Sequence, residues 1–580
     1  MQSNIKKELL FQELLNKNEQ DSLQQWIKCC KDCRETQERV LKEILMEAKD
    51  SMLGKKYDFA SIKTIEEFQN KVPISEYEAI QDEIELMAEG REDILFQGRT
   101  EYFISTSGTT GISKKIPESK NSMEAKKAVN KLRKAFLMGE LYPHMKKSPR
   151  FAAFLKHKQI DPKDVTPKEL MKQFHFYSVT SAIAGQKTSG GIDIGYASGK
   201  TFENSDFAEN LAYPKELMSL KDGEATMYLT MLFGLRYDDV AMVTSNNAGR
   251  LYARIEYAKE HAKELLHDLT YGTIKEDIIL SEEERKIAES YMTPQPERAK
   301  ELQKLLDQGK EFFIPKYYWP YLMVARFWLS GSVGVNVKKI RKYLPDDLLY
   351  FDIGYGASEG KINIPFQKDL GCGTLGIASL FFEFQSMEDN RILTADQLED
   401  GKEYDLILTN FGGLYRYPLH DVVQVKGFME NTPNIEFITK SKEILNIAQE
   451  KLPASSVLSC MNQLALELGT AMKQAQIFPD NENSRYVIFM ELEGNSSIDF
   501  NISNFEELLD NRLKEGFDLY GRNRKFESLQ APQVVLMKNG WQDNLFALKE
   551  QKGTPKSQIK LESMIIKVPE NKWILKREES

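Results

Sequence analysis

The stretch Ser105–Pro117 limits the possible folds more than any other part of the chain. It reads Ser-Thr-Ser-Gly-Thr-Thr-Gly-Ile-Ser-Lys-Lys-Ile-Pro and follows Thr100–Ile104, whose residues are typical of a short strand. Gly108 and Gly111 let the backbone turn sharply and approach a ligand closely. The pattern therefore predicts a strand that opens into a glycine-containing loop.

The same stretch carries the donors that a polyphosphate needs. Lys114 and Lys115 supply positive charge, and five residues supply hydroxyl groups: Ser105, Thr106, Ser107, Thr109 and Thr110. A polar surface turn is the alternative interpretation. The stretch has no Gly-Lys pair, so it is not a Walker A loop, and it has no Gly-x-Gly, so it is not a dinucleotide fingerprint.

Composition excludes several classes of protein. The 580 residues are 41% hydrophobic, which predicts more than one domain. The net charge of −9 argues against a general surface for nucleic acid or anionic membrane. Without an apolar leader or a run of about 18–20 apolar residues, we expect a cytoplasmic protein.

The cysteines and histidines give little sign of a metal site. Five cysteines, an odd and sparse set, fit reduced thiols, and six histidines are scattered. Cys30-x-x-Cys33 resembles half of a zinc or redox site, but it has no second pair and lies in a polar helical segment. We expect no zinc centre.

Helical patterns dominate the first half of the chain. Residues from about 4 to 50 are predicted to be helical, with an apolar face that includes Val40–Leu45. Lys120–Lys147 is a basic helical run, for which a solvated face is the expected state. Ala225–Thr273 is predicted to be strongly helical.

Short apolar runs separated by glycines follow, and they predict strands. Examples are Leu348–Ile353, Ser379–Phe384 and Tyr404–Thr409. Long helices with interleaved strands indicate an α/β domain over residues 1–438, with the helical segment 1–50 at its start. Helices and strands alternate again over 439–580, which predicts a small α+β domain.

Two further motifs can be interpreted together with the first loop. Tyr355-Gly-Ala-Ser-Glu359 follows a predicted strand, and its aromatic ring can stack on a base while its carboxylate can hold Mg²⁺. Tyr415–Asp421 ends in a carboxylate that can accept hydrogen bonds from ribose hydroxyls. Taken singly, each also fits an ordinary core or turn residue.

In this order, the three motifs resemble those of the acyl acid amido synthetases, the auxin-responsive promoter family that includes plant auxin-conjugating enzymes and bacterial relatives. That family belongs to the adenylate-forming superfamily, with the acyl-CoA synthetases and luciferases. Gln37–Leu41, Leu265–Thr273 and Phe382–Phe384 are also similar to the family, so the resemblance extends over roughly residues 35 to 560. It implies a large adenylation domain and a small mobile C-terminal domain.

The resemblance implies an AMP-forming ligase that uses ATP and Mg²⁺. A carboxylic acid attacks the α-phosphate of ATP, and an amine, typically of an amino acid, then displaces AMP. The implied nucleotide-binding residues are Ser107, Gly108, Thr109, Thr110, Lys114, Tyr355, Ser358, Glu359, Arg416 and Asp421. Glu359 is the implied Mg²⁺ ligand and a catalytic residue.

The resemblance also assigns parts of the C-terminal domain. A hinge is expected at Lys440 and Ser441, and Lys552 is chosen over Lys556 as the lysine that reaches the α-phosphate. A loose basic tail is the alternative for the second of these segments. Acyl-pocket candidates are the aromatic residues upstream of the second motif, for which core packing is the alternative: Tyr317, Trp319, Phe327 and Trp328.

Two departures from the family pattern bear on the nucleotide site. His420 stands where the family has glycine, so it can strain the turn before Asp421 or add a titratable group. The first loop continues Gly111-Ile-Ser-Lys114 instead of Gly-Lys-Pro-Lys. An acyl-CoA ligase and a nucleotide-binding protein without catalysis remain alternatives. We expect a monomer acting on small molecules, with no nucleic-acid or membrane partner, and neither the acid nor the amine can be named.

Overall fold

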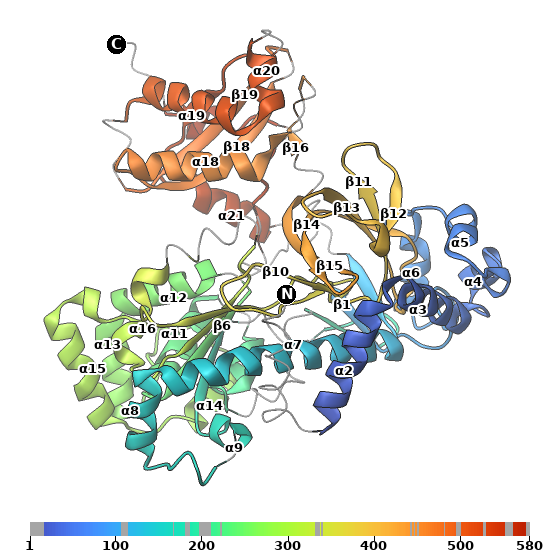
Figure 1. The fold of residues 1–580 in the computed structure, drawn as a ribbon. Helices are drawn as coiled ribbons and strands as arrows, with labels where there is room; N and C mark the ends of the chain where they lie inside the picture. The colour runs from blue at the N-terminus through green and yellow to red at the C-terminus, as the bar shows by residue number, and fades with distance from the viewer. Residues whose placement is uncertain are drawn as a thin grey trace. The chain divides into compact units, whose positions relative to one another are not determined.

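A computed structural model of the chain describes residues 17–105, 114–165, 167–179, 186–196, 210–220, 223–246, 248–330, 337, 340–440, 444–445, 447–448, 450, 452–480, 482–494, 500–525, 529–551, 559, 561–565 and 567–575. The chain divides into two compact units. The larger contains most residues up to Phe437, and the smaller contains Ile438–Ser580 together with His420–Val422. Helices and strands alternate in both units (Figure 1), which confirms the predicted α/β fold class.

The larger unit is rich in helices that precede or separate its strands. Their bounds are α2 Lys17–Lys31, α3 Cys33–Ala48, α4 Met52–Lys56, α5 Ile65–Lys71, α6 Gln81–Ala88, α7 Lys120–Lys147, α8 Pro149–Lys158, α9 Pro167–Met171, α11 Gly223–Leu235, α12 Ala248–Glu260, α13 Ala262–Tyr271, α14 Glu282–Ser290, α15 Pro296–Gln308 and α16 Pro315–Tyr318. The predicted apolar face of α3 is buried, with Val40 and Ile44 at most 1% exposed. Thr64 and Glu67 form a capping box that starts α5.

Three sheets make up the strand framework of this unit within the described residues. A four-stranded sheet has the order β2-β1-β5-β4, from β1 Tyr102–Ser105, β2 Lys115–Glu118, β4 Gln186–Lys187 and β5 Asp193–Gly195. A parallel sheet has the order β3-β6-β7-β8, from β3 His175–Val179, β6 Val240–Ser245, β7 Val324–Phe327 and β8 Leu349–Asp352. A seven-stranded sheet has the order β12-β11-β13-β14-β15-β10-β9, from β9 Asn363–Ile364, β10 Cys372–Leu375, β11 Phe381–Ser386, β12 Ile392–Thr394, β13 Glu403–Thr409, β14 Tyr417–Met429 and β15 Thr432–Lys440.

The parallel sheet is covered on both faces, as this kind of sheet requires. Phe176, Met242 and Val324 pack with residues of α7 and α8 on one face. Tyr177 and Val243, their neighbours along the strands, pack with α11 on the other. The prediction of continuous helix over Ala225–Thr273 was wrong at β6, because a run of four apolar residues between two helices shows no helical period of its own.

Helix α7 matches its predicted bounds, but the expectation of a solvated face was only partly correct. The helix is capped by Ser119 and packs on α2, α8 and the strands β8 and β9. Arg133 is 6% exposed, and the apolar residues Val129, Phe136 and Leu137 are buried with it. One side of this basic helix is therefore part of the protein interior.

The smaller unit has its own sheet and core. Its elements are β16 Ile444–Leu445, β17 Leu452–Pro453, α18 Ala454–Glu467, β18 Met472–Asp480, β19 Arg485–Leu492, α19 Ile502–Gly516, α20 Asp518–Lys525, β20 Gln533–Leu536 and α21 Trp541–Gln551. The sheet order is β18-β19-β20, and α18 and α19 pack together. Asp510 receives hydrogen bonds from Tyr520 and Arg524 inside this core. In the part of the chain that the structure describes, no helix combines the length and apolarity of a membrane span.

Candidate active site

The second predicted motif forms a tight turn between β8 and β9. The Ala357 N–H donates to the Gly360 carbonyl at 2.9 Å, and the Ile362 N–H donates to the Tyr355 carbonyl at 3.0 Å. The buried side chain of Asn363 accepts from the Tyr355 N–H at 2.8 Å. The turn is therefore closed at its base by its own backbone and one amide side chain.

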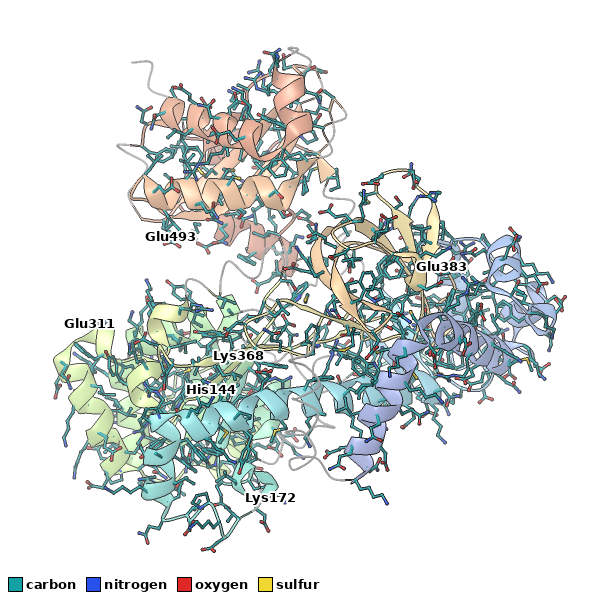
Figure 2. The ribbon with its side chains drawn as sticks, in the orientation of Figure 1. His144, Lys172, Glu311, Lys368, Glu383 and Glu493 are labelled. Carbon is teal, nitrogen blue, oxygen red and sulfur yellow. The ribbon has the colours of Figure 1, made fainter. Side chains whose placement is uncertain are left out.

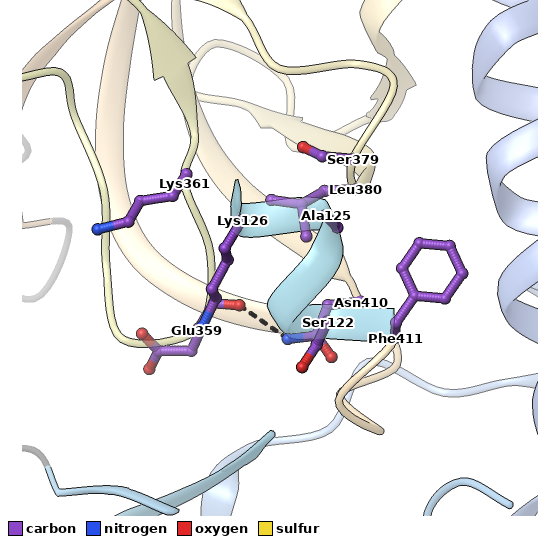
Figure 3. Close-up of a pocket in the computed structure, with 9 residues that line it drawn as sticks. All are labelled: Ser122, Ala125, Lys126, Glu359, Lys361, Ser379, Leu380, Asn410 and Phe411. Atoms are coloured by element: carbon purple, nitrogen blue, oxygen red, sulfur yellow. Dashed lines mark hydrogen bonds between the residues drawn. The ribbon is translucent and has the colours of Figure 1, made fainter. Parts of the chain in front are cut away.

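Three side chains from outside the turn bind its backbone carbonyls. Arg133 donates to the Tyr355 carbonyl at 2.7 Å, and Lys126 donates to the Ser358 carbonyl at 2.7 Å. Asn410, which follows β13, donates to the Glu359 carbonyl at 2.8 Å (Figure 3). These three contacts use only backbone carbonyls of the turn, so none of them involves the Ser358 or Glu359 side chain.

Lys126 and Arg133 come from the same face of α7, since seven residues make about two helical turns. Lys126 also pairs with Glu118 of β2, which is 2% exposed and accepts from the Ser122 hydroxyl at 3.0 Å. This pairing offsets the lysine charge in a half-buried position. Sequence reasoning missed Glu118, Lys126, Arg133 and Asn410, although the seven-residue spacing of two basic residues on one helix face was a usable signal.

The backbone before the turn depends on a glycine. Gly354 has φ +87°, and a Cβ atom there would lie 2.4 Å from Cζ of Arg133. Its N–H donates to Asp352, whose other oxygen accepts from the Leu329 N–H at 2.7 Å. Burial raises the pKa of Asp352 to about 6, while these hydrogen bonds and the nearby arginine charges oppose the shift.

Glu359 lies at the tip of the turn and is partly exposed. Its side chain and that of Lys361 extend to the same side, away from Phe411 (Figure 3). The Lys361 side chain has no hydrogen-bond or ion-pair partner in the described part of the chain, and its Cδ would lie 3.3 Å from a Cβ atom added to Gly356. Burial and the charges of Arg133 and Lys126 lower the pKa of Lys361 to about 7. A cavity of ≈ 10 Å³ beside these residues is close to the size of one water molecule.

Glu359 fits the kind of ligand that Mg²⁺ takes. Magnesium binds oxygen donors and usually combines one or two carboxylates with substrate phosphates and water. Among the described residues, no group of three or more acidic, histidine or cysteine side chains could hold a metal by itself. Cys30 and Cys33 are buried free thiols, and burial raises the pKa of Cys33 to about 11.

Tyr355 belongs to a small aromatic cluster. Its ring is parallel to that of Trp328, with centroids 6.4 Å apart, and its centroid lies 5.5 Å from that of Phe437. Trp328 is thus a direct neighbour of a predicted adenine-binding residue. That adenine lies on Tyr355 and that Trp328 contacts the acyl group both stay predictions.

Arg416 is buried in an ion pair within the larger unit. It is 6% exposed, and its Nε lies 3.0 Å from an oxygen of Glu383, which is 1% exposed. Its Nη1 donates to the carbonyls of Gln69 and Val72 at 2.8 and 2.9 Å. Figure 2 labels Glu383 on the seven-stranded sheet. These contacts hold the backbone at Arg416 itself, whose φ is +48°. Direct contact of Arg416 with a nucleotide stays a prediction.

The other predicted residues have varied surroundings. Asp421, on β14, is 2% exposed, and His420 has φ +54°, a region where glycine has no steric cost. The Nζ atom of Lys114 lies 3.4 Å from Oε1 of Glu78 and over the ring of Tyr77. Ser107, Gly108, Thr109, Thr110, Ser441 and Lys552 lie outside the described residues, and Lys440 ends β15.

Two of the acyl-pocket candidates are core residues. Trp319 and Phe327 are both fully buried, and the Trp319 indole N–H donates to the Gly234 carbonyl at 3.1 Å. Tyr317 is 39% exposed. Of the four candidates, Trp328 is the one that the described contacts connect with the Tyr355 turn. Direct contact of all four with an acyl group stays a prediction.

This fold and this turn define an α/β protein that presents a carboxylate on a rigid turn after a parallel strand. The chain matches the models of the GH3 family N-terminal domain over residues 22–349, the GH3 family central domain over 373–440 and the GH3 family C-terminal domain over 459–568. Since these matches span most of its length, the chain belongs to the GH3 family, which confirms the resemblance inferred from the motifs.

Curated relatives are similar over nearly the whole chain. Jasmonoyl--L-amino acid synthetase JAR4 of Nicotiana attenuata is 26% identical over 542 residues, which is 88% of this chain and 87% of that protein. The 4-substituted benzoates-glutamate ligase GH3.12 of Arabidopsis thaliana is 24% identical, over 85% of this chain and 86% of that protein. The solved GH3.15 acyl acid amido synthetase has the same fold, with a TM-score of 0.75, 20% identity and 94% of each chain covered.

Proposed function

We propose that this GH3 protein is an ATP-dependent acyl acid amido synthetase. It activates a carboxylic acid as an acyl-adenylate and then transfers the acyl group to an amine. The names of two relatives describe a synthetase of jasmonoyl-L-amino acids and a ligase of 4-substituted benzoates and glutamate. The observation that carries the proposal is the turn that presents Glu359, held by Lys126, Arg133 and Asn410. Such preorganisation is what stabilisation of developing charge requires.

In the first half-reaction, a carboxylate oxygen of the acid bonds to the α-phosphorus, and the bond from that phosphorus to the pyrophosphate oxygen breaks. Glu359 would hold Mg²⁺, which would offset the negative charge of the phosphates. Tyr355 lies against adenine and Asp421 binds the ribose hydroxyls. Ser107, Thr109, Thr110 and Lys114 bind the phosphates, in accord with their hydroxyl and ammonium donors.

In the second half-reaction, the amine nitrogen bonds to the acyl carbon, AMP leaves with the electrons of the C–O bond, and the nitrogen loses a proton. This step depends mainly on positioning, because AMP is a good leaving group. We assign residues 439–580 to a domain that turns about Lys440 and Ser441 between the two steps, with Lys552 as the catalytic lysine of the first. A cytoplasmic monomer with no nucleic-acid or membrane partner completes the proposal.

Pyrophosphate exchange over a panel of carboxylic acids tests this function. Acid-dependent exchange into ATP, with hydroxamate formed when hydroxylamine is added, is the expected result. Mass spectrometry after addition of an amino-acid mixture or CoA then separates an amido synthetase from an acyl-CoA ligase. Absence of exchange with every acid, despite ATP binding, would support the alternative of a nucleotide-binding protein without catalysis.

A further inference from the structure

The parallel sheet places three polar residues, Ser178, Thr244 and Arg326, in one row near the carboxyl ends of its strands. Ser178 of β3 pairs with Thr244 of β6, Thr244 pairs with Arg326 of β7, and Arg326 pairs with Phe351 of β8. Side chains in one such row share a face of the sheet. Two residues earlier, the same face carries Phe176, Met242 and Val324, so the row lies on the side of the sheet that α7 covers. The carboxyl ends of parallel strands are where α/β sheets bind ligands.

Arg326 has a donor atom that lacks a hydrogen-bond acceptor. Its Nε is buried without a hydrogen-bond partner, and no ion pair within 4.0 Å joins it to any described residue. Asp352 is its electrostatic neighbour, but no hydrogen bond or ion pair joins the two side chains, and the Asp352 oxygens accept from the Leu329 and Gly354 N–H groups. Burial lowers the pKa of Arg326 to about 10, so the group is still a cation at neutral pH.

Further polar atoms near the same strand ends also lack partners. The Ser178 hydroxyl is in the row itself, and the Trp328 indole N–H and the Ser330 hydroxyl follow β7 directly. Each is buried and has no hydrogen bond within the residues that the structure describes. Buried polar groups are paired in the large majority of cases. All four can donate and one is cationic, which matches an anionic ligand that presents several acceptors.

We propose that this row, with Arg326 as its charged residue, binds a carboxylate group of a substrate other than the carboxylate that is activated. The inference rests on the proposed function and specifies its substrates. An acid with an apolar tail would leave the buried Nε of Arg326 without an acceptor, which is costly. Adjacent strands are about 4.8 Å apart, so Ser178 and Arg326 are separated by about 10 Å, a span suited to a small elongated ligand.

Two sources can supply this carboxylate: a second carboxylate on the acyl acid, or the α-carboxylate of the acceptor amino acid. Pyrophosphate exchange without amine depends only on the acid, so the exchange rates of diacids are compared with those of their half-esters. Amide formation also depends on the acceptor, so the rates of amide formation with amino acids are compared with those of their methyl esters. Wild-type protein is expected to prefer the free carboxylate by about tenfold or more in kcat/KM in one of the two comparisons.

Arg326→Met is expected to reduce that preference to near one while turnover of the ester continues. Arg391→Met is the matched control, because Arg391 is an exposed arginine paired only with neighbouring Asp389 among the described residues. An unchanged preference in Arg326→Met, or a wild-type protein indifferent to the ester in both comparisons, would overturn the inference. If Arg326→Met fails to fold, the wild-type comparison decides alone.

A binding measurement separates this inference from the proposed function. Diacids or amino acids that occupy the row should raise the thermal unfolding temperature of wild-type protein more than their esters do, and this difference should vanish in Arg326→Met. Stabilisation without any acid-dependent exchange would support the site and contradict the synthetase function. Exchange without any carboxylate preference, in turnover and in stabilisation, would contradict the site alone.

Discussion

The turn at Tyr355–Glu359 and the turn at Arg416 both carry residues that the sequence assigns to the nucleotide, yet their contacts are opposite. In the first, other parts of the protein bind the backbone carbonyls and the Glu359 side chain stays partly exposed. In the second, the motif residue itself is buried and binds carbonyls of the chain. A residue of a binding motif can therefore serve the ligand directly or hold the backbone that presents another residue.

The largest difference between the two turns should appear in Glu359→Ala. We expect adenylation to fall by about a thousandfold or more, since a metal-holding carboxylate stabilises charge in the transition state. The thermal unfolding temperature should stay near that of wild type, because the side chain is partly exposed. Pyrophosphate exchange and thermal melts measure the two quantities. Glu124→Ala, an exposed change on α7, is the control, and exchange at the wild-type rate in Glu359→Ala would refute the Mg²⁺ assignment.

Arg416→Met should show the reverse profile. Removing one partner of a buried ion pair leaves Glu383 uncompensated, so we expect a loss of about 3–5 kcal/mol in unfolding free energy of the larger unit. Denaturant unfolding measures it. Replacing Glu383 and Arg416 together with methionine should recover part of the loss. Normal stability with lost ATP binding would show instead that Arg416 serves the nucleotide.

Lys126→Met tests whether Lys126 acts by positioning the Tyr355–Glu359 turn or only by adding positive charge to α7. Loss of the hydrogen bond to the Ser358 carbonyl should loosen the turn and reduce kcat for adenylation by about tenfold, with KM for ATP changing less. It should also cost about 1–3 kcal/mol of unfolding free energy, because Glu118 loses its ion-pair partner and keeps only the hydrogen bond from Ser122. Lys127→Met, the next residue on the exposed side of the helix, should change neither quantity. Equal effects of the two substitutions would contradict the positioning role.

The smallest expected effect concerns Asp352, beneath the first turn. Its pKa of about 6 lies above the unfolded value, so between about pH 4 and 6 the folded state binds more protons than the unfolded state. Its contribution to stability is therefore present below about pH 4 and is lost as the pH rises through 6. The difference in unfolding temperature between wild type and Asp352→Asn should shrink from pH 4.5 to 6.5 and then stay constant. A difference that does not vary with pH would contradict the raised pKa.

Sequence patterns predicted those parts of the molecule in which local and global signals agree. The bounds of α7 and the buried face of α3 followed from helical spacing. The family was inferred from the resemblance of three motifs, taken in their order along the chain. Strand β6 was missed because a strand of six residues, four of them apolar, carries too little periodicity between two helices.

The contacts that organise the site were less accessible from the sequence. Lys126 and Arg133 look like solvated residues of a basic helix, and only the tertiary structure brings them to carbonyls more than two hundred positions away. The pair of Arg416 with Glu383 is similarly non-local. Arg326 has an ordinary sequence context, and its exceptional feature, a buried Nε without an acceptor, exists only in the folded sheet.

The close approach of α11 to the parallel sheet has an evolutionary consequence. A Cβ atom on Gly234 would lie 2.8 Å from the ring of Tyr177, although the glycine does not need an unusual backbone angle. The side chains at positions 234 and 177 thus compete for the same space between α11 and the sheet. Across the sequences of relatives, a larger residue at position 234 should occur together with a smaller one at 177, so the pair should be inherited as a unit.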